Sequence, residues 1–142
     1  MRVFVSTYNC FSLAIPIKYV LSISINKQNS DYKIFYNHEN RNTYISLPLL
    51  FNCPLDIRHS IIIKNPDSDD NAMENKTVLL GTEIENESDI PSDSFFPVPK
   101  TLNVMRFSLV FSGISFNKST GDPILLLNPE YLIQNIQKEL LS

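Results

Sequence analysis

Several features that mark catalytic and metal-binding proteins are missing from this 142-residue sequence. Its three glycines, Gly81, Gly113 and Gly121, lie far apart, so no glycine-rich loop is available to cradle a phosphate. It contains only two histidines and neither an HExxH nor a CxxC motif, so the usual ligand spacing of a transition-metal site does not occur. A GxSxG nucleophile elbow is also lacking. These absences predict a protein that is not an enzyme and that uses neither a cofactor nor a metal.

Positive charge is not in surplus, and no region of the sequence is strongly basic. The chain has 12 Lys and Arg against 15 Asp and Glu, which gives a net charge of -3. Nucleic acids and anionic membrane surfaces both require a basic patch on the protein, so neither is an expected partner. No apolar run approaches the roughly 20 residues of a membrane helix, and the first residues lack the apolar core and cleavage site of a secretory signal. The sequence therefore predicts a cytoplasmic protein that does not insert into a membrane.

Two cysteines and two acidic stretches are the remaining features of the sequence with chemically reactive or charged side chains. Cys10 and Cys53 both lie beside apolar residues, which favours buried, reduced thiols, although a disulfide between them stays open. Residues 66–76 read PDSDDNAMENK, and the first part is faintly similar to an EF-hand loop. The stretch lacks the glycine of the sharp turn and the glutamate at the twelfth position, so a solvated hairpin loop is favoured over a calcium site. Residues 85–100 contain three prolines and several acids, and they are expected to form an extended connection.

Short runs of Ile, Val, Phe and Tyr alternate with polar turns along most of the chain, which is typical of β-strands. Pro16 interrupts one run, because proline cannot donate to a sheet ladder, and the spacing of Ile17, Val20 and Leu21 indicates one helical turn. Three consecutive isoleucines at 61–63 indicate a strand that is buried on both faces. The pattern predicts roughly nine or ten strands, with segments at residues 3–5, 11–15, 23–25, 32–36, 43–47, 60–63, 77–84, 105–111, 113–116 and 124–127.

The end of the sequence combines a strand with the start of a helix. Ile124 to Leu127 form an uninterrupted apolar run, and Asn128-Pro129-Glu130 follows it. Asn128 can accept a hydrogen bond from an N–H of the first helical turn, and Pro129 suits the first helical position, where no N–H is needed. Glu130 lies near the positive end of the helix dipole. The sequence therefore predicts a helix whose apolar stripe consists of Leu132, Ile133, Ile136 and Leu140.

Four stretches, taken in order, resemble the CheW-like domain, the adaptor module of bacterial chemotaxis arrays. They are FSLAIPIKYVLSI (11–23), TYISLPLLFN (43–52), VLLGTEIENESDIPS (78–92) and FSGISFNKSTGDPILLLNPEYLI (111–133). The resemblance covers nearly the whole chain and implies a mainly β fold of two small five-stranded β-barrel lobes with a short C-terminal helix. It also implies one domain, residues 1–142, in which the two lobes are interleaved. The family's N-L-R-G stretch is not matched, because the corresponding residues 36–42 read YNHENRN and contain no glycine.

For function, the resemblance implies a non-catalytic signal-transduction scaffold that couples chemoreceptors to a CheA-type histidine kinase. The expected partners are the receptor signalling tip, docked in an apolar groove between the lobes, and the kinase's homologous regulatory domain. The candidate partner-binding residues are Ile34, Tyr36, His38, Arg41, Tyr44, Phe107 and Phe111. An alternative assignment places the aromatic and aliphatic members of this set in the core and the other two in a solvated turn.

Two other functions stay open from the sequence. The unmatched YNHENRN turn is consistent with a diverged module that keeps the fold but binds a different protein. The acidic residues 67–74 and the scattered aromatic residues are the basis for a small-ligand-binding or enzymatic β-barrel.

Overall fold

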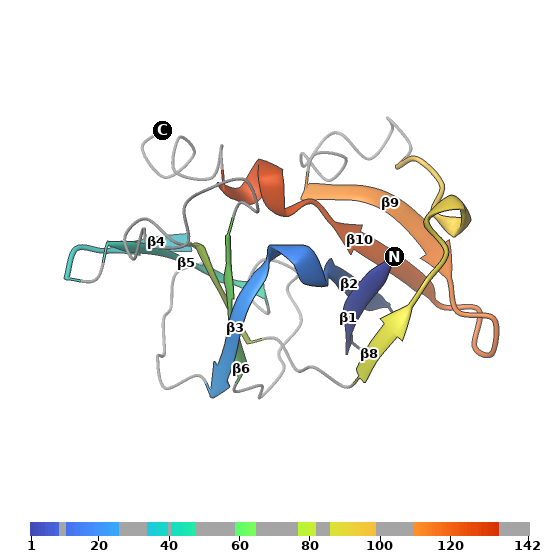
Figure 1. Cartoon of the computed structure of the whole chain (residues 1–142), viewed down its shortest axis with the longest axis horizontal. Helices are drawn as coiled ribbons and strands as arrows, with labels where there is room; N and C mark the ends of the chain where they lie inside the picture. Colours follow the sequence, from blue (N-terminus) through green and yellow to red (C-terminus); the bar gives the residue numbers. More distant parts are fainter. Residues whose placement is uncertain are drawn as a thin grey trace.

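The computed structural model describes residues 1–8, 11–25, 34–39, 41–47, 59–64, 77–81, 86–98 and 110–133 of the chain. Ten β-strands in these ranges form two five-stranded sheets (Figure 1). The strands are β1 (Arg2–Thr7), β2 (Ser12–Pro16), β3 (Val20–Ile25), β4 (Ile34–Asn37), β5 (Asn42–Ser46), β6 (His59–Ile63), β7 (Thr77–Leu80), β8 (Asn86–Asp89), β9 (Phe111–Phe116) and β10 (Pro123–Leu127), and the two 3-10 helices are η1 (Ile17–Tyr19) and η2 (Ser92–Ser94). The predicted mainly β class is confirmed.

The two sheets are interleaved in the sequence. The first sheet has the order β8-β1-β2-β10-β9 and takes its strands from both ends of the chain, so blue strands lie beside orange ones in Figure 1. The second sheet, β3-β6-β7-β5-β4, takes its strands from the middle of the chain. Read from β8 and from β3 respectively, both sheets pair antiparallel, antiparallel, parallel and antiparallel. The two lobes thus share one pairing pattern, and the first lobe needs both ends of the chain.

One hydrophobic core is shared by the two sheets. Its fully buried side chains come from both and include Leu13, Ile15, Ile45, Ile61, Ile63, Leu79 and Leu127. The faces turned away from this core carry one smaller cluster each, formed by Val3, Ala14 and Leu126 in the first sheet and by Tyr44 and Val78 in the second. Neighbouring residues of a strand point to opposite faces. In the unbroken apolar run of β10, Leu125 and Leu127 therefore lie in the shared core, and Leu126 lies in the smaller cluster on the opposite face of the sheet.

The strand pairings of the described residues leave both sheets open. In this part of the chain no pairing joins β8 to β9 or β3 to β4, so the predicted closure of each lobe into a barrel is not confirmed. The prediction of five strands in each lobe is confirmed, and so is the short C-terminal helix, since residues 129–133 are helical.

Three local predictions differ from the structure. The helical turn after Pro16 is a 3-10 helix, and the next strand begins at Val20 rather than at Ile23. The strand expected to begin at Gly113 begins at Phe111 instead and is β9, while most of the other strand expected there, residues 105–111, lies outside the described part of the chain. Strand β8 was not predicted, because its sequence, NESD, is polar throughout. It forms nevertheless, because its backbone pairs with β1 at the edge of the sheet, where polar side chains can meet water.

Candidate functional site

A groove opens where two parallel strands end together. β10 pairs with β2 in parallel, with Leu126 opposite Ala14. Two residues further along each chain, Asn128 therefore lies at the level of Pro16. At this level the two chains separate. β2 continues through η1 into the second sheet, whereas β10 continues into the helical residues 129–133. A crevice forms outside the carboxyl ends of neighbouring parallel strands when their chains leave in different directions.

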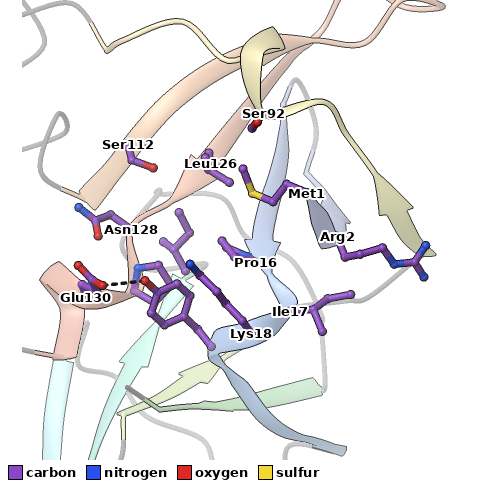
Figure 2. A pocket seen from close by; sticks show the side chains of 13 residues that line it. Met1, Arg2, Pro16, Ile17, Lys18, Ser92, Ser112, Leu126, Asn128 and Glu130 are labelled. Carbon is purple, nitrogen blue, oxygen red and sulfur yellow. Dashed lines mark hydrogen bonds between the residues drawn. The ribbon is translucent and has the colours of Figure 1, made fainter. Parts of the chain in front are cut away.

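The groove has a volume of about 830 Å³ and is shown in Figure 2. Its apolar and aromatic lining is Met1, Pro16, Ile17, Tyr19, Leu126, Leu127 and Pro129, and its polar lining is Arg2, Lys18, Ser92, Ser112, Asn128 and Glu130. Among these lining residues Glu130 is the one carboxylate, and there is no histidine or cysteine. An apolar lining with a few polar groups is suited to holding a ligand or a partner.

Tyr19 fixes one wall of the groove. Its hydroxyl donates a hydrogen bond to Oε1 of Glu130 at 2.8 Å, which joins η1 to the first helical turn (Figure 2, dashed line). Its backbone carbonyl accepts from the N–H of Lys64 at 2.8 Å, so the same residue is also held by the end of β6. The Nζ atom of Lys18 lies 5.2 Å from the centre of the Tyr19 ring, within the range of a cation–π contact. The wall is therefore held in place without a bound partner.

The other wall begins at Asn128, and the prediction that this residue caps the helix is confirmed. Its Oδ1 accepts a hydrogen bond from the N–H of Tyr131 at 3.3 Å, and its carbonyl accepts from the N–H of Leu132 at 3.4 Å. Its own N–H donates to the carbonyl of Val110 at 2.7 Å. Leu132 is 1% exposed and belongs to the shared core, while the predicted stripe residues 136 and 140 lie outside the described part of the chain.

Exposed ion pairs beside the groove hold β1 against β8. The Arg2 guanidinium donates to the Glu87 carboxylate, and the terminal ammonium of Met1 donates to Oδ1 of Asp89 and to the carbonyl of Ile90, both at 3.0 Å. The hydrogen bond from the ammonium lowers the pKa of Asp89, and the hydrogen bond to Glu87 raises the pKa of Arg2. Exposed pairs contribute little to stability. Their effect here is to orient Met1 and Arg2, which line the groove.

Most of the predicted partner-binding residues lie on the β4–β5 hairpin, outside the groove. In its register Ile34 is opposite Ile45, and Phe35 is opposite Tyr44. Directly opposed residues share a face, so Ile34 and Tyr36 lie on one face of the hairpin and Tyr44 lies on the other. Tyr44 is 6% exposed and stacks on Phe35 with ring centroids 4.8 Å apart. The three predicted residues therefore do not form one surface. Phe35 was missed, because its position opposite Tyr44 depends on the register across the hairpin.

The exposed end of the hairpin contains His38 and Arg41, and the half-buried Tyr36 lies next to it. The rings of Tyr36 and His38 meet edge to face with centroids 5.0 Å apart. His38 and Arg41 are both exposed. Arg41 adopts a φ of 58°, in the left-handed region that favours glycine.

The remaining predicted residues are not at the surface or are not described. Phe111 is 1% exposed and belongs to the shared core. This agrees with the alternative prediction, in which the aromatic residues of the set lie in the core. Phe107, Cys10, Cys53 and the acidic stretch 66–76 lie outside the described residues, so the expectations for them stay predictions. Within the described ranges, no helix is long and apolar enough to cross a membrane. In the same ranges, no three His, Cys, Asp or Glu side chains gather as metal ligands would.

No protein-family model matches the sequence, and no curated protein matches it. Among solved structures, the crystal structure of the scaffolding protein TtCheW from Thermoanaerobacter tengcongensis is similar. Its TM-score is 0.60, and the match covers 89% of this chain and 83% of TtCheW. The chain has a CheW-like fold. Because the sequence identity is 15%, the likeness concerns the arrangement of the strands rather than individual side chains.

In this CheW-like fold, the groove lies where two of the resembling stretches meet. Residues 11–23 supply the wall at η1, and residues 111–133 supply the wall at the helix. Pro16 ends a strand in the first stretch, and Pro129 starts a helix in the second. These two prolines are the local sequence feature that marks the walls of the groove. None of the groove residues was predicted as partner-binding, because the pairing of β2 with β10 cannot be seen in either stretch alone.

Proposed function

We propose that this protein is a non-catalytic adaptor of the chemotaxis type, which couples chemoreceptors to a CheA-type histidine kinase. The observation that carries the proposal is the shared fold, since 89% of the chain matches a protein described as a scaffolding protein. A fold alone does not determine a function, so the proposal also rests on two surfaces of this chain. In the proposal the protein works in the cytoplasm as one domain of two interleaved lobes, and it catalyses no reaction.

The groove is the surface for the receptor signalling tip, presented as an amphipathic helix. Ile17 and Met1 offer apolar contacts, and Lys18 and Glu130 offer a positive and a negative charge beside them. Helix-in-groove recognition uses apolar side chains at three- and four-residue spacing, and a few anchors dominate the binding energy. Because the hydrogen bond from Tyr19 to Glu130 already joins the two walls, little reorganisation is needed on binding.

The exposed end of the β4–β5 hairpin is the surface for the second partner, the kinase's regulatory domain. Tyr36 and Arg41 belong to residue types that are enriched in interfaces, and His38 packs against the Tyr36 ring. This surface is separate from the groove lining, so both partners can bind at once. Tyr44 and Phe111 are buried, and their part is to support the hairpin and β9 rather than to touch the partner.

Titration calorimetry with the purified protein tests the proposal. A chemoreceptor signalling-tip fragment and a CheA-type regulatory domain from the same organism should each bind saturably. Ile17→Glu places a charge in the groove, so it should weaken receptor binding roughly tenfold or more and leave the regulatory domain unaffected. Phe116→Glu makes a similar change at a residue that is 55% exposed and not part of the groove, so it should affect neither titration. If neither fragment binds, the proposal is wrong.

A diverged module with a different partner is the second candidate, and the conformation of Arg41 favours it. A left-handed φ costs a residue other than glycine on the order of 1 kcal/mol, and the resemblance led us to expect a glycine-bearing stretch in this hairpin. An arginine with φ of 58° at the exposed turn is consistent with a hairpin surface altered for another protein. Binding of one fragment but not the other in the titrations supports this candidate, whereas binding of both counts against it.

A further inference from the structure

Strand β3 is an edge strand with exposed apolar side chains. It pairs with β6, and no other described strand pairs with its outer edge. Leu21, Ile23 and Ile25 on this strand are 36%, 37% and 68% exposed. They are three of the six large hydrophobic residues that are exposed in the described part of the chain. The strand sequence, VLSISI, contains no charge, no proline and no glycine.

Both edges of the first sheet are protected in the described structure, and β3 is not. β8 occupies the equivalent edge of the first sheet and carries Glu87 and Asp89 within four residues. The edge of β9 is covered where Ile114 exchanges two backbone hydrogen bonds of 2.8 Å with Phe96. β4, the other edge of the second sheet, also carries no charge, but its four residues are half-buried and none of them is an exposed large hydrophobic residue as three of β3 are. Natural proteins block edge strands with charges, prolines or covering segments, because an unpaired edge is a template for another strand. β3 therefore has the properties of a strand-pairing site.

The sequence of β3 has the same pattern in both directions around Ile23. If two β3 strands pair antiparallel with Ile23 opposite its copy, Ser22 comes opposite Ser24 and Leu21 comes opposite Ile25. Opposed side chains share a face, so apolar side chains meet apolar ones and hydroxyls meet hydroxyls. We propose that β3 is a self-association site, which binds β3 of a second copy of this chain and joins the two second sheets into one continuous sheet.

A second copy fits this edge better than an unrelated strand does. The pairing has two-fold symmetry, in which the same surface serves both partners, as in most closed dimers. The strand carries no charge, so two identical edges do not repel each other when they meet. The regular ladder with β6 runs from Ser22 to Ile25, and a bulge lies at Leu21, so the template is short. Interfaces that bury less than roughly 1,200 Å² are generally weak, and we expect a dimer that forms as the concentration rises.

Sedimentation velocity over a wide range of protein concentration tests the association. The average mass should rise from that of one chain toward that of two. Ile23→Lys and Ile25→Lys each place a charge on the edge and should keep the chain monomeric over the same range. Phe116→Lys makes an equivalent change at a residue on β9 that is 55% exposed, and it should leave the dimer intact. A wild-type chain that stays monomeric throughout, or a dimer that persists in both β3 variants, overturns the proposal.

Cysteine cross-linking tests the register of the pairing. In a background with Cys10→Ser and Cys53→Ser, Ile23→Cys should form a disulfide-linked dimer under mild oxidation. Directly opposed Cα atoms in an antiparallel pair are roughly 4.5–5.5 Å apart, which a disulfide can span. Ser22→Cys chains should cross-link when mixed with Ser24→Cys chains but not on their own. If Ile23→Cys cross-links no faster than Phe116→Cys, the proposed pairing is wrong.

Discussion

Asn128 is the residue at which the last strand, the last helix and the groove meet. Its side chain accepts the hydrogen bond that starts the helix, its N–H pairs with Val110, and it lines the groove. Pro129 follows at a position where the missing N–H costs nothing. Asn128 and Pro129 together thus set the direction in which the chain leaves β10. The helical residues that follow form one wall of the groove.

Asn128→Ala should destabilise the protein by about 1 kcal/mol, because the N–H of Tyr131 loses its acceptor. The measurement is the free energy of unfolding in urea. Asn128→Asp is the matched control, since a carboxylate oxygen can accept the same hydrogen bond. The capping role would be refuted if Ala and Asp at this position gave the same stability as the wild type.

Strand β8 shows how an element without an apolar face is held in a sheet. Its backbone pairs with β1 from Arg2 to Val5, and the exposed ion pairs of Arg2 and Met1 lie along the same contact. Backbone hydrogen bonds need no particular side chain, so a polar strand can form at an edge if its neighbour is fixed. The carboxylates of β8 then protect that edge from further pairing, which is the protection that β3 lacks.

The ion pair of Asp89 makes stability depend on pH on the acid side. The pKa of this carboxyl is lower in the folded chain than in the unfolded one, so the unfolded chain takes up the proton first as the pH falls. The pair therefore stabilises the fold at neutral pH, and this contribution is lost as the pH falls below about 4.

Urea unfolding measured at a series of pH values checks this. Asp89→Asn should be slightly less stable than the wild type at neutral pH, and the two curves should converge in acid, where the wild-type carboxyl is also neutral. A difference between Asp89→Asn and the wild type that stays constant down to strong acid would contradict the assignment.

At the scale of the whole molecule, the shared core couples the two sheets. Ile15 on β2 and Ile45 on β5 are both 0% exposed and belong to the same cluster, although they lie in different sheets. The first sheet also needs β1 and β2 to meet β9 and β10 from the other end of the chain. We therefore expect the two lobes to unfold as one unit, as the proposed single domain requires.

Unfolding followed residue by residue tests this coupling. Amide signals from strands of both sheets, recorded by NMR during a urea titration, should disappear in one transition. Ile15→Ala and Ile45→Ala should each lower the stability of both sheets together, by roughly 2–5 kcal/mol for a large-to-small change in a core. Phe116→Ala, at a side chain that is 55% exposed, should change stability by less than about 0.5 kcal/mol. Loss of the second-sheet signals while the first-sheet signals persist would show two independent units.

Local patterns predicted much of the fold and little of the candidate site. The hairpin of residues 34–46, the buried strand at 60–63 and the cap at Asn128 were all predicted, because alternation and capping depend on residues close in sequence. The split of Tyr36 and Tyr44 onto opposite faces depends on the register across the hairpin. The residues that line the groove were not predicted, because its two walls come from opposite ends of the chain.

The sequence by itself determined where most strands lie, where prolines end them and where the last helix starts, since each of these depends on contacts within a few residues. Only the tertiary structure decided that β2 lies parallel to β10, that β8 completes the first sheet, and that β3 is an edge strand among the described residues. Any of these strands could pair with many others by pattern alone. The choice among them depends on burying one core between two sheets, which is a property of the whole chain.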